Sequence, residues 1–428
     1  MGRGRPGSSR HLLPLILLGA LLAAWPLALQ AQGNPPPSPN SVIGLAVSPA
    51  DPAQILAGTL NAPQVAGIYR STDAGLTWAD TNAPLPPNTA IAAILFDPQD
   101  PARVLAVDGG VGRLFLSTDG GQTWREEPSL QQALSPNSAV GRLFARVEGD
   151  TTVIYAGSRW DGVLRTQDGG RTWEKLAEGL QDQGVRVRAL AAKDGILYAG
   201  THNGLYRLLP DTLTWQQITT FPTRTIVRGL TVWQGLLYAG TFDGRVLFSP
   251  DGVTWSQDTS FPGGMAIYDL ATAGYRLVAA TSNGLWGRLD GDWSHDPVDG
   301  QPYAAGVYKL AAASSLPGVI YAGTEQDWVL RSDDGGRTWS SYRTLSPLIP
   351  EQVPGPPTPT PTATPTPTDT PTPTATPTAT ATPTPTPSLV EQAAREVVQL
   401  PPSWLAAMTV LLVVVLMAGL AVVRGPEE

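Results

Sequence analysis

Four carboxylates stand in short turns between apolar runs, where a pair of them would permit acid–base chemistry on a glycosidic bond. Asp161 lies in W-D-G, Asp243 in T-F-D-G, and Glu325 and Asp327 in T-E-Q-D-W. Glycoside hydrolysis needs two carboxyl groups at a defined separation across the scissile bond. Asp-Gly between apolar runs is also a strong hairpin signal, because both residues tolerate positive φ. We therefore interpret these carboxylates first as turn residues, and hydrolysis is the alternative.

Side chains that bind metals are scarce in this chain. It has no Cys and three His, of which His11 lies in the N-terminal leader. His202 together with Asp243 would supply too few nitrogen or sulfur ligands for zinc. We therefore predict no metal site and no cofactor. The formal net charge of −8 argues against nucleic acid as a partner, because nucleic-acid binding depends largely on cationic contacts to phosphate.

Aromatic side chains in the same turns suggest a second kind of chemistry, which is recognition without catalysis. Exposed aromatic rings beside charges would suit a carbohydrate or a peptide segment. If Trp160 and Trp328 pack under neighbouring loops, they are structural instead, and the sequence leaves both interpretations open. The candidate ligand-binding residues are Arg159, Trp160, Asp161, His202, Phe242, Asp243, Glu325, Asp327 and Trp328.

These turns belong to a repeat that recurs seven times. Its clearest form is S-T-D-G-G-Q-T-W, from Ser117 to Trp124. The last residue of each copy is a Trp, and successive copies lie 46, 49, 42, 40, 38 and 46 residues apart, a period that indicates a repeat architecture. The motif residues are Asp73, Gly75 and Trp78; Asp119, Gly121 and Trp124; Asp168, Gly170 and Trp173; Asp211 and Trp215; Asp251 and Trp255; Asp334, Gly336 and Trp339; and a shortened copy that ends at Trp293.

Each repeat also carries the pattern of four short strands, which is typical of a propeller blade. The first is a short apolar run, as in Val187 to Ala192, and the second ends in a small-residue triplet that is usually A-G-T, as in Ala199 to Thr201. Small residues suit strands near an axis where blades converge. We predict an all-β protein with a seven-bladed β-propeller of four-stranded blades at residues 42–346, plus a Pro/Thr-rich linker and one C-terminal transmembrane helix.

The pattern S/T-x-D-x-G-x-T-W resembles the Asp-box, or BNR repeat, of sialidases, sortilin-type receptors, xyloglucan-cleaving glycosidases and photosystem II assembly factors. The resemblance implies that the box is a turn between the third and fourth strands of a blade. It further implies that the Asp side chains accept backbone N–H bonds within the turn, that the Gly residues adopt a conformation that a Cβ penalises, and that the Trp residues pack in the core. Strand alternation then puts the candidate ligand-binding residues on the face opposite the boxes.

The activities of this family do not transfer residue by residue. A sialidase resemblance would require three Arg, a Tyr-Glu pair and an Asp acid, and no matching motif surrounds those residue types here. Xyloglucan-cleaving enzymes pair carboxylates between two such propellers, whereas this chain holds one. The arginine-lined patch of the photosystem II assembly factors has no residue-by-residue counterpart either. The resemblance therefore predicts the fold more strongly than the ligand.

The segments outside residues 42–346 predict export and membrane anchoring. Residues 1–31 have the layout of a signal peptide, with an uncleaved N-terminal anchor as the alternative, and residues 32–41 form a spacer. A Pro/Thr-rich stalk at 347–388 and a juxtamembrane segment at 389–402 precede an apolar run at 403–423 that is long enough to span a bilayer. Residues 424–428 would be cytoplasmic. A C-terminal sorting signal that is cut off after export is the alternative for the apolar run.

Together these features predict a cell-surface, membrane-anchored propeller that acts as a non-catalytic recognition or scaffold module for an extracellular protein or glycan. The alternative is a cell-surface glycoside hydrolase or lyase acting on polysaccharide. The two hypotheses differ in one observable feature, because only the enzyme needs two carboxylates that converge in one pocket.

Overall fold

A computed structural model describes residues 41–60, 66–82, 85–349 and 353. The chain divides into two units, residues 1–358 and 359–428, and the described residues all belong to the first. The predicted signal peptide, juxtamembrane segment, membrane span and tail lie outside the described residues, as does the predicted stalk except for residues 347–349 and 353. Leu348 and Val353 pack against the core between the first and last blades. Within the described residues, no helix has the length and apolar character that a membrane crossing needs.

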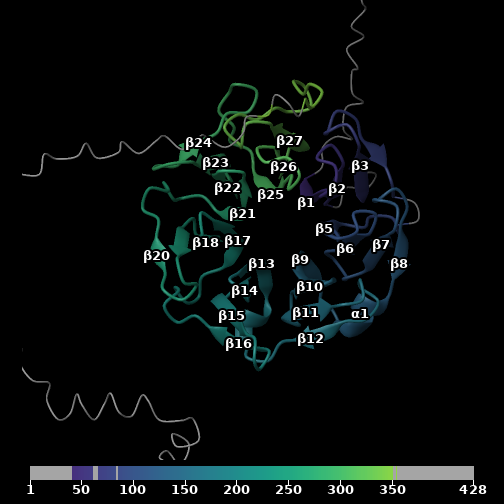
Figure 1. Cartoon of the computed structure of the whole chain (residues 1–428), viewed down its shortest axis with the longest axis vertical. Coiled ribbons are helices and arrows are strands. Elements are labelled where there is room, and N and C mark those ends of the chain that lie inside the picture. The colour runs from purple at the N-terminus through teal and green to yellow at the C-terminus, as the bar shows by residue number, and fades with distance from the viewer. Residues whose placement is uncertain (1–40, 61–65, 83–84, 350–352, 354–428) are drawn as a thin grey trace, which may run out of the picture. The chain divides into compact units, whose positions relative to one another are not determined.

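Seven antiparallel sheets surround a central axis, and in each sheet the strands follow one another in chain order (Figure 1). The first three blades comprise β1 (Val42–Val47), β2 (Ile55–Thr59), β3 (Ile68–Ser71) and β4 (Ala79–Asp80); β5 (Ile91–Phe96), β6 (Val104–Asp108), β7 (Leu114–Ser117) and β8 (Arg125–Glu127); and β9 (Val140–Glu148), β10 (Thr151–Ser158), β11 (Val163–Thr166) and β12 (Glu174–Leu176).

The remaining four blades complete the ring and confirm the predicted seven-bladed propeller. They comprise β13 (Val187–Lys193), β14 (Ile196–Thr201), β15 (Gly204–Leu209) and β16 (Thr214–Gln217); β17 (Val227–Trp233), β18 (Leu236–Thr241), β19 (Val246–Ser249) and β20 (Ser256–Gln257); β21 (Ile267–Ala273), β22 (Arg276–Thr281), β23 (Gly284–Arg288) and β24 (Ser294–His295); and β25 (Val307–Ala312), β26 (Ile320–Thr324) and β27 (Val329–Ser332). In the seventh blade the fourth position is a short antiparallel bridge between Arg331 and Ser340.

Two blade-joining segments contain more regular structure than the sequence indicates. The helix α1 (Ser129–Ala133) follows β8, and the 3₁₀ helix η1 (Asp182–Val185) precedes β13. Leu130 of α1 is fully buried, which explains why this segment folds back onto the blades.

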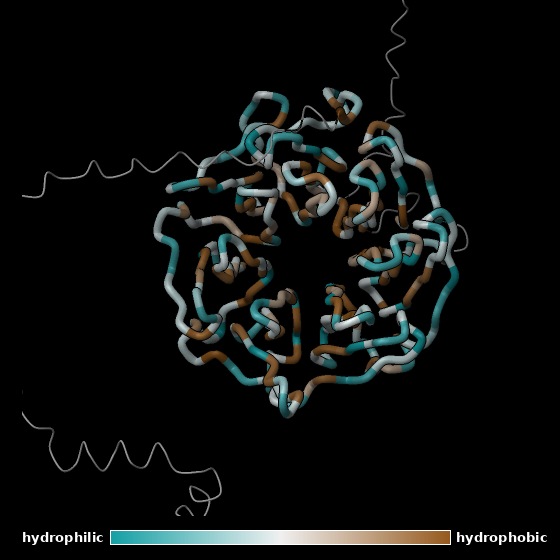
Figure 2. The backbone as a smooth tube through the Cα atoms, viewed as in Figure 1, coloured by the Kyte–Doolittle hydropathy of each residue, from teal (hydrophilic) through white to brown (hydrophobic). Residues whose placement is uncertain are grey.

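The first strands of all blades are innermost (Figure 1), and hydrophobic residues are more frequent in the inner part of each blade than in the connections at the rim (Figure 2). Small residues are required because the blades converge. A Cβ on Gly229 of β17 would lie 2.8 Å from the backbone N of Leu270 in the next blade. Farther out, Trp residues fill the wider spaces, as when Trp215 packs into the cluster formed by the third and fourth blades. Both observations confirm the predicted division between a small-residue centre and a Trp-filled periphery.

The ring closes by packing and hydrogen bonds between the last and first blades, without an exchanged strand among the described residues. Trp328 of the last blade is 3% exposed, and its ring lies edge-on to Tyr69, with centroids 5.0 Å apart, and to Trp78 at 5.8 Å. The hydroxyl of Tyr321 donates to the carbonyl of Pro52 at 2.8 Å. The buried guanidinium of Arg331 donates to the carbonyl of Ala74 at 3.0 Å.

Candidate functional site

The Asp-box turns use their polar groups internally. In the second blade, Ser117 Oγ donates to Asp119 Oδ1 at 2.7 Å, the backbone N–H of Thr123 donates to the same oxygen at 2.9 Å, and the backbone N–H of Gly121 donates to Ser117 Oγ at 2.9 Å. Gly121 has φ +82, which a Cβ would strain. Burial alone would raise the pKa of Asp119, but hydrogen bonds from Thr123, Ser117 and Gln122 hold it below its ordinary value.

The same bonds recur at Asp73, Asp168 and Asp334, and the structure confirms the turn role predicted for them. Asp211 differs. Leu209 stands two residues before it, where the intact boxes have Ser or Thr, and no hydrogen bond to the Asp211 side chain occurs within the described part of the chain. Asp251 has equivalent bonds from Ser249 and Thr254, whereas the shortened sixth copy has Arg288 in place of the hydroxyl residue. The box is therefore a structural staple in five blades, and the carboxylates of these five boxes are engaged within their own turns.

The opposite end of the axis has a backbone arrangement that is common to all seven blades. Each first strand is bulged at its second residue, because the register with the second strand shifts there. In each blade the residue after the second strand also donates its backbone N–H to the carbonyl of the residue that precedes the first strand. Phe242 thus donates to Ile226 at 2.9 Å and His202 to Arg186 at 3.2 Å. Bulges re-aim side chains and are common beside active sites.

This arrangement presents two rings of side chains at that end, which we call the mouth. The inner ring consists of the bulged residues Ile43, Ala92, Gly141, Arg188, Arg228, Tyr268 and Tyr308. The outer ring consists of the residues that follow the second strands, Leu60, Gly109, Arg159, His202, Phe242, Ser282 and Glu325. The backbone repeats sevenfold, whereas the side chains do not.

The side chains of the third to fifth blades form a cationic sector, defined by Arg159, Arg186, Arg188 and Arg228. None of these guanidinium groups forms an ion pair with a carboxylate among the described residues. Burial lowers the pKa of Arg188, and repulsion from the other three lowers it further. Arg186 Nε is buried without a hydrogen-bond partner in the described structure. The sector therefore holds four positive charges without an ion-pair partner among the described residues.

His202 is a neutral member of this sector. Its Nε2 accepts a hydrogen bond from Arg188 Nε at 3.0 Å. Burial lowers its pKa to about 4, and the charges of Arg188, Arg186 and Arg228 contribute to the shift. Its neutral imidazole therefore orients Arg188 near neutral pH instead of adding a fifth charge.

Aromatic rings lie against these arginines. The guanidinium carbon of Arg186 lies 3.8 Å from the centroid of the Trp160 ring, and that of Arg228 lies 4.9 Å from Tyr268 and 5.5 Å from Phe242. Trp160 is 42% exposed and Phe242 is 45% exposed. Cation–π contacts hold an arginine in place without neutralising its charge. The arrangement can bind an anion while offering an apolar ring face beside it.

Below the mouth, three charged residues meet across the axis. Arg142 of β9 and Lys309 of β25 both contact Asp269 of β21, at 3.2 and 2.9 Å. The facing inner strands carry only Gly or Ala at this level, which makes room for the long side chains. Two positive charges meet one negative charge, so this triad adds to the positive field of the mouth. It also separates the mouth from two axial cavities of about 240 and 320 Å³ on its far side, both of which Arg142 lines.

The structure separates the candidate ligand-binding residues into three groups. Arg159, His202, Phe242 and Glu325 belong to the outer ring, and Trp160 is exposed beside Arg186. The carboxylates of Asp161, Asp243 and Asp327 instead pair with Lys175, Arg245 and Arg343 at 2.7, 2.6 and 2.7 Å. Trp328 is buried in the closing seam and offers no exposed ring, so the packed one of its two interpretations holds and it is removed from the candidate ligand-binding residues.

Sequence reasoning missed Arg186, Arg188, Arg228, Tyr268 and Tyr308. A signal for most of them was present, because aligning V-R-A-L, V-R-G-L, I-Y-D-L and V-Y-K-L puts the last four at the second position of a first strand. In a regular strand, the second residue would not be expected to direct its side chain toward the mouth. The bulge turns it there, and the sequence has no signal for the bulge.

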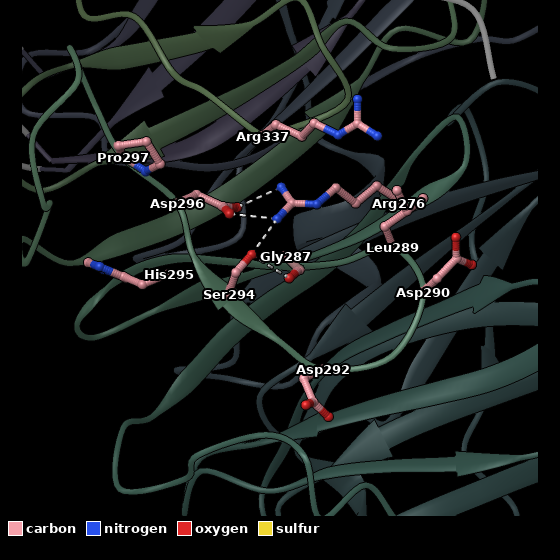
Figure 3. A pocket seen from close by; sticks show the side chains of 10 residues that line it. All are labelled: Arg276, Gly287, Leu289, Asp290, Asp292, Ser294, His295, Asp296, Pro297 and Arg337. Atoms are coloured by element: carbon pink, nitrogen blue, oxygen red, sulfur yellow. Dashed lines mark hydrogen bonds and ion pairs between the residues drawn. The ribbon is translucent and has the colours of Figure 1, made fainter. Parts of the chain in front are cut away.

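A cavity of about 340 Å³ at the rim of the sixth blade is the strongest alternative place for carboxylate chemistry (Figure 3). There Arg276 donates to both oxygens of Asp296, at 2.9 and 2.6 Å, and also to Gly336 of the next blade. Burial raises the pKa of Asp296 to about 7, although the Arg276 bonds oppose the rise. Figure 3 shows the side chains of Asp290 and Asp292 directed away from Asp296. The three carboxylates do not converge. The ion pair lies within the sixth blade, and the hydrogen bond from Arg276 to Gly336 joins that blade to the seventh.

The model of the family described as "Sortilin, neurotensin receptor 3" matches residues 66–206. The match covers about a third of the chain. With the seven blades and the repeated boxes, it supports the predicted resemblance to Asp-box (BNR) and sortilin-type propellers. A solved propeller titled "YCF48 bound to D1 peptide" superposes on this Asp-box propeller with a TM-score of 0.54 at 18% identity, covering 68% of this chain and 93% of that one.

Xyloglucanases are also similar to this Asp-box propeller. A xyloglucanase of a Paenibacillus species is 25% identical over 305 residues, which are 61% of this chain and 27% of that protein. Xyloglucanase Xgh74A of Acetivibrio thermocellus is 31% identical over 108 residues, which are 23% of this chain and 13% of that protein. A solved xyloglucanase from Xanthomonas campestris has a TM-score of 0.52 at 17% identity, covering 71% of this chain and 54% of that one. The chain thus spans about a quarter or less of the curated relatives' length, and the structural likenesses show the fold alone.

Proposed function

We propose that this propeller is a non-catalytic recognition module whose mouth binds an extracellular protein or glycan. The observation that carries the proposal is the contrast between the sevenfold backbone of the mouth and its unequal side chains. A rigid scaffold that presents varied side chains at one end is the usual design of a binding surface. In this proposal the chain is exported and residues 403–423 hold it at the cell membrane, with the stalk at 347–388 as spacer.

The glycoside hydrolase alternative is favoured by the similarity to xyloglucanases. It requires two free carboxylates across a bond. Near the mouth, Asp161, Asp243 and Asp327 are engaged by cations, and hydrogen bonds with Lys175, Ser135 and Ser138 hold the pKa of Asp161 at about 2 despite its burial. A carboxyl group with so low a pKa is a poor general acid at neutral pH. We therefore favour binding over hydrolysis.

The test is a mixed array of acidic and neutral glycans and peptides, probed with the purified full-length chain. The mouth variant carries Arg188→Gln and Arg228→Gln, and the control carries Arg171→Gln and Arg337→Gln, two exposed arginines in the box turns. We expect a ligand that binds the wild type and the control but not the mouth variant. A ligand lost only by the control would overturn the proposal. Product analysis on any bound glycan would reveal shortened chains if hydrolysis occurs.

A further inference from the structure

The charge of the mouth is opposite to that of the protein as a whole. The chain has a formal net charge of −8, yet Arg159, Arg186, Arg188 and Arg228 stand together without carboxylate partners among the described residues. Clustered like charges repel one another and disfavour folding, and a buried unpaired donor adds to that cost. An anionic ligand would relieve both, because guanidinium groups bind carboxylates through charge-assisted hydrogen bonds.

The neighbouring blades leave space beside these arginines. The second blade presents only Ala92 and Gly109 to the mouth, and the third presents Gly141 in its inner ring. A Cβ on Gly141 would lie 3.8 Å from Arg188 Nη1. The cationic sector therefore borders a region of minimal side chains, beside the exposed rings of Trp160 and Phe242.

The backbone of the mouth is not available to a peptide. The N–H groups that follow the second strands are all bonded to carbonyls of the same blade, at 2.8 to 3.2 Å. The next turn amides are also occupied, as when the N–H groups of Asn203 and Asp327 donate to Thr201 and Thr324 side chains. Recognition of a peptide by β-strand addition needs free main-chain groups. Recognition at the mouth depends instead on guanidinium groups and aromatic faces, which suits sugar rings that carry carboxylates.

We propose that the mouth binds a carboxylate-bearing glycan, with uronate groups on Arg186, Arg188 and Arg228 and sugar rings against Trp160 and Phe242. This inference rests on the proposed recognition role of the mouth and adds the chemical class of the ligand. His202 keeps Arg188 oriented and stays neutral near pH 7. The positive triad of Arg142, Asp269 and Lys309 forms the floor of the site.

The test is calorimetric titration of the purified full-length chain with polygalacturonate oligosaccharides and with the same oligosaccharides after methyl esterification, which removes the charge and keeps the sugar backbone. We expect the esterified form to bind at least about tenfold more weakly. Each charge-assisted contact corresponds to about a tenfold change or more, so Arg188→Gln with Arg228→Gln should weaken polygalacturonate binding about a hundredfold. Arg171→Gln with Arg337→Gln should change it less than about threefold.

Thermal unfolding of each variant separates loss of binding from loss of folding. Equal binding of the two oligosaccharide forms, or equal effects of the two arginine pairs, would overturn the inference. Tight binding of polyglutamate without binding of polygalacturonate would also overturn the inference, because it would mean that the mouth recognises acidic peptides. If polygalacturonate fails but the array yields another ligand that the mouth variant loses, the recognition role stands and only the ligand class is wrong.

Discussion

The two faces of the propeller differ in what repeats from blade to blade. On the box face, the motif side chains repeat and their polar groups bond to one another, as at Asp119 and Asp334. On the mouth face, the backbone repeats and the side chains diverge, so that Arg188 and Arg228 occupy positions held elsewhere by Ala92 or Gly141. In this chain, the motif residues that repeat from blade to blade have structural roles. The candidate site lies where the backbone repeats but the side chains differ between blades.

Two tryptophans provide the largest expected contrast. Replacing the buried Trp328 with Ala should lower the free energy of unfolding by about 3 kcal/mol or more, because it removes a ring packed against Tyr69 and Trp78 in the closing seam. The matched change Trp160→Ala should cost less than about 1 kcal/mol, because that ring is 42% exposed. Chemical denaturation of both variants measures this. Similar losses for the two would contradict the assignment of Trp328 to structure and Trp160 to the surface.

The Asp-box should behave as a staple. Asp119→Ala should lower the free energy of unfolding by about 1 to 2 kcal/mol, because the turn amides and hydroxyls around it lose their acceptor. Asp211→Ala should change it by less than about 0.5 kcal/mol, since its box lacks these bonds within the described residues. Neither change should alter ligand affinity. A loss of ligand affinity in a folded Asp119→Ala variant would contradict the assignment of the box face to structure and of the mouth to binding.

His202 should give a smaller, pH-dependent effect. Its pKa in the folded chain is about 4, below the ordinary 6.5, so the unfolded chain binds more protons between those values. The stability linked to His202 is fully present above about pH 6.5 and is lost as the pH falls toward 4. Unfolding followed at pH 7, 6, 5 and 4 should therefore show a steeper decline in the wild type than in His202→Gln. Parallel declines would mean that His202 is not held neutral by the cationic sector.

The fold was predictable because its signals are local. Gly121 at positive φ and the hydroxyl of Ser117 specify a turn within one blade, and the glycines of the A-G-T triplets mark where the next blade comes close. The site was only partly predictable. Arg159 and His202 stand beside recognisable turns, but Arg188 and Arg228 reach the mouth through a bulge that depends on pairing with the second strand. Trp328 became structural because the last blade meets the first, a contact between residues more than 240 positions apart in the chain.

Arginine footprinting most directly tests the claim that the mouth is the ligand-binding face, because it needs no substitution. The purified full-length chain is treated with phenylglyoxal, alone and with a bound array ligand, and each modified arginine is identified by mass spectrometry. The account predicts that the ligand protects Arg159, Arg188 and Arg228 at the mouth, while Arg171 and Arg337 in the box turns react at an unchanged rate. Protection of Arg171 and Arg337 with unchanged reactivity at the mouth would contradict it.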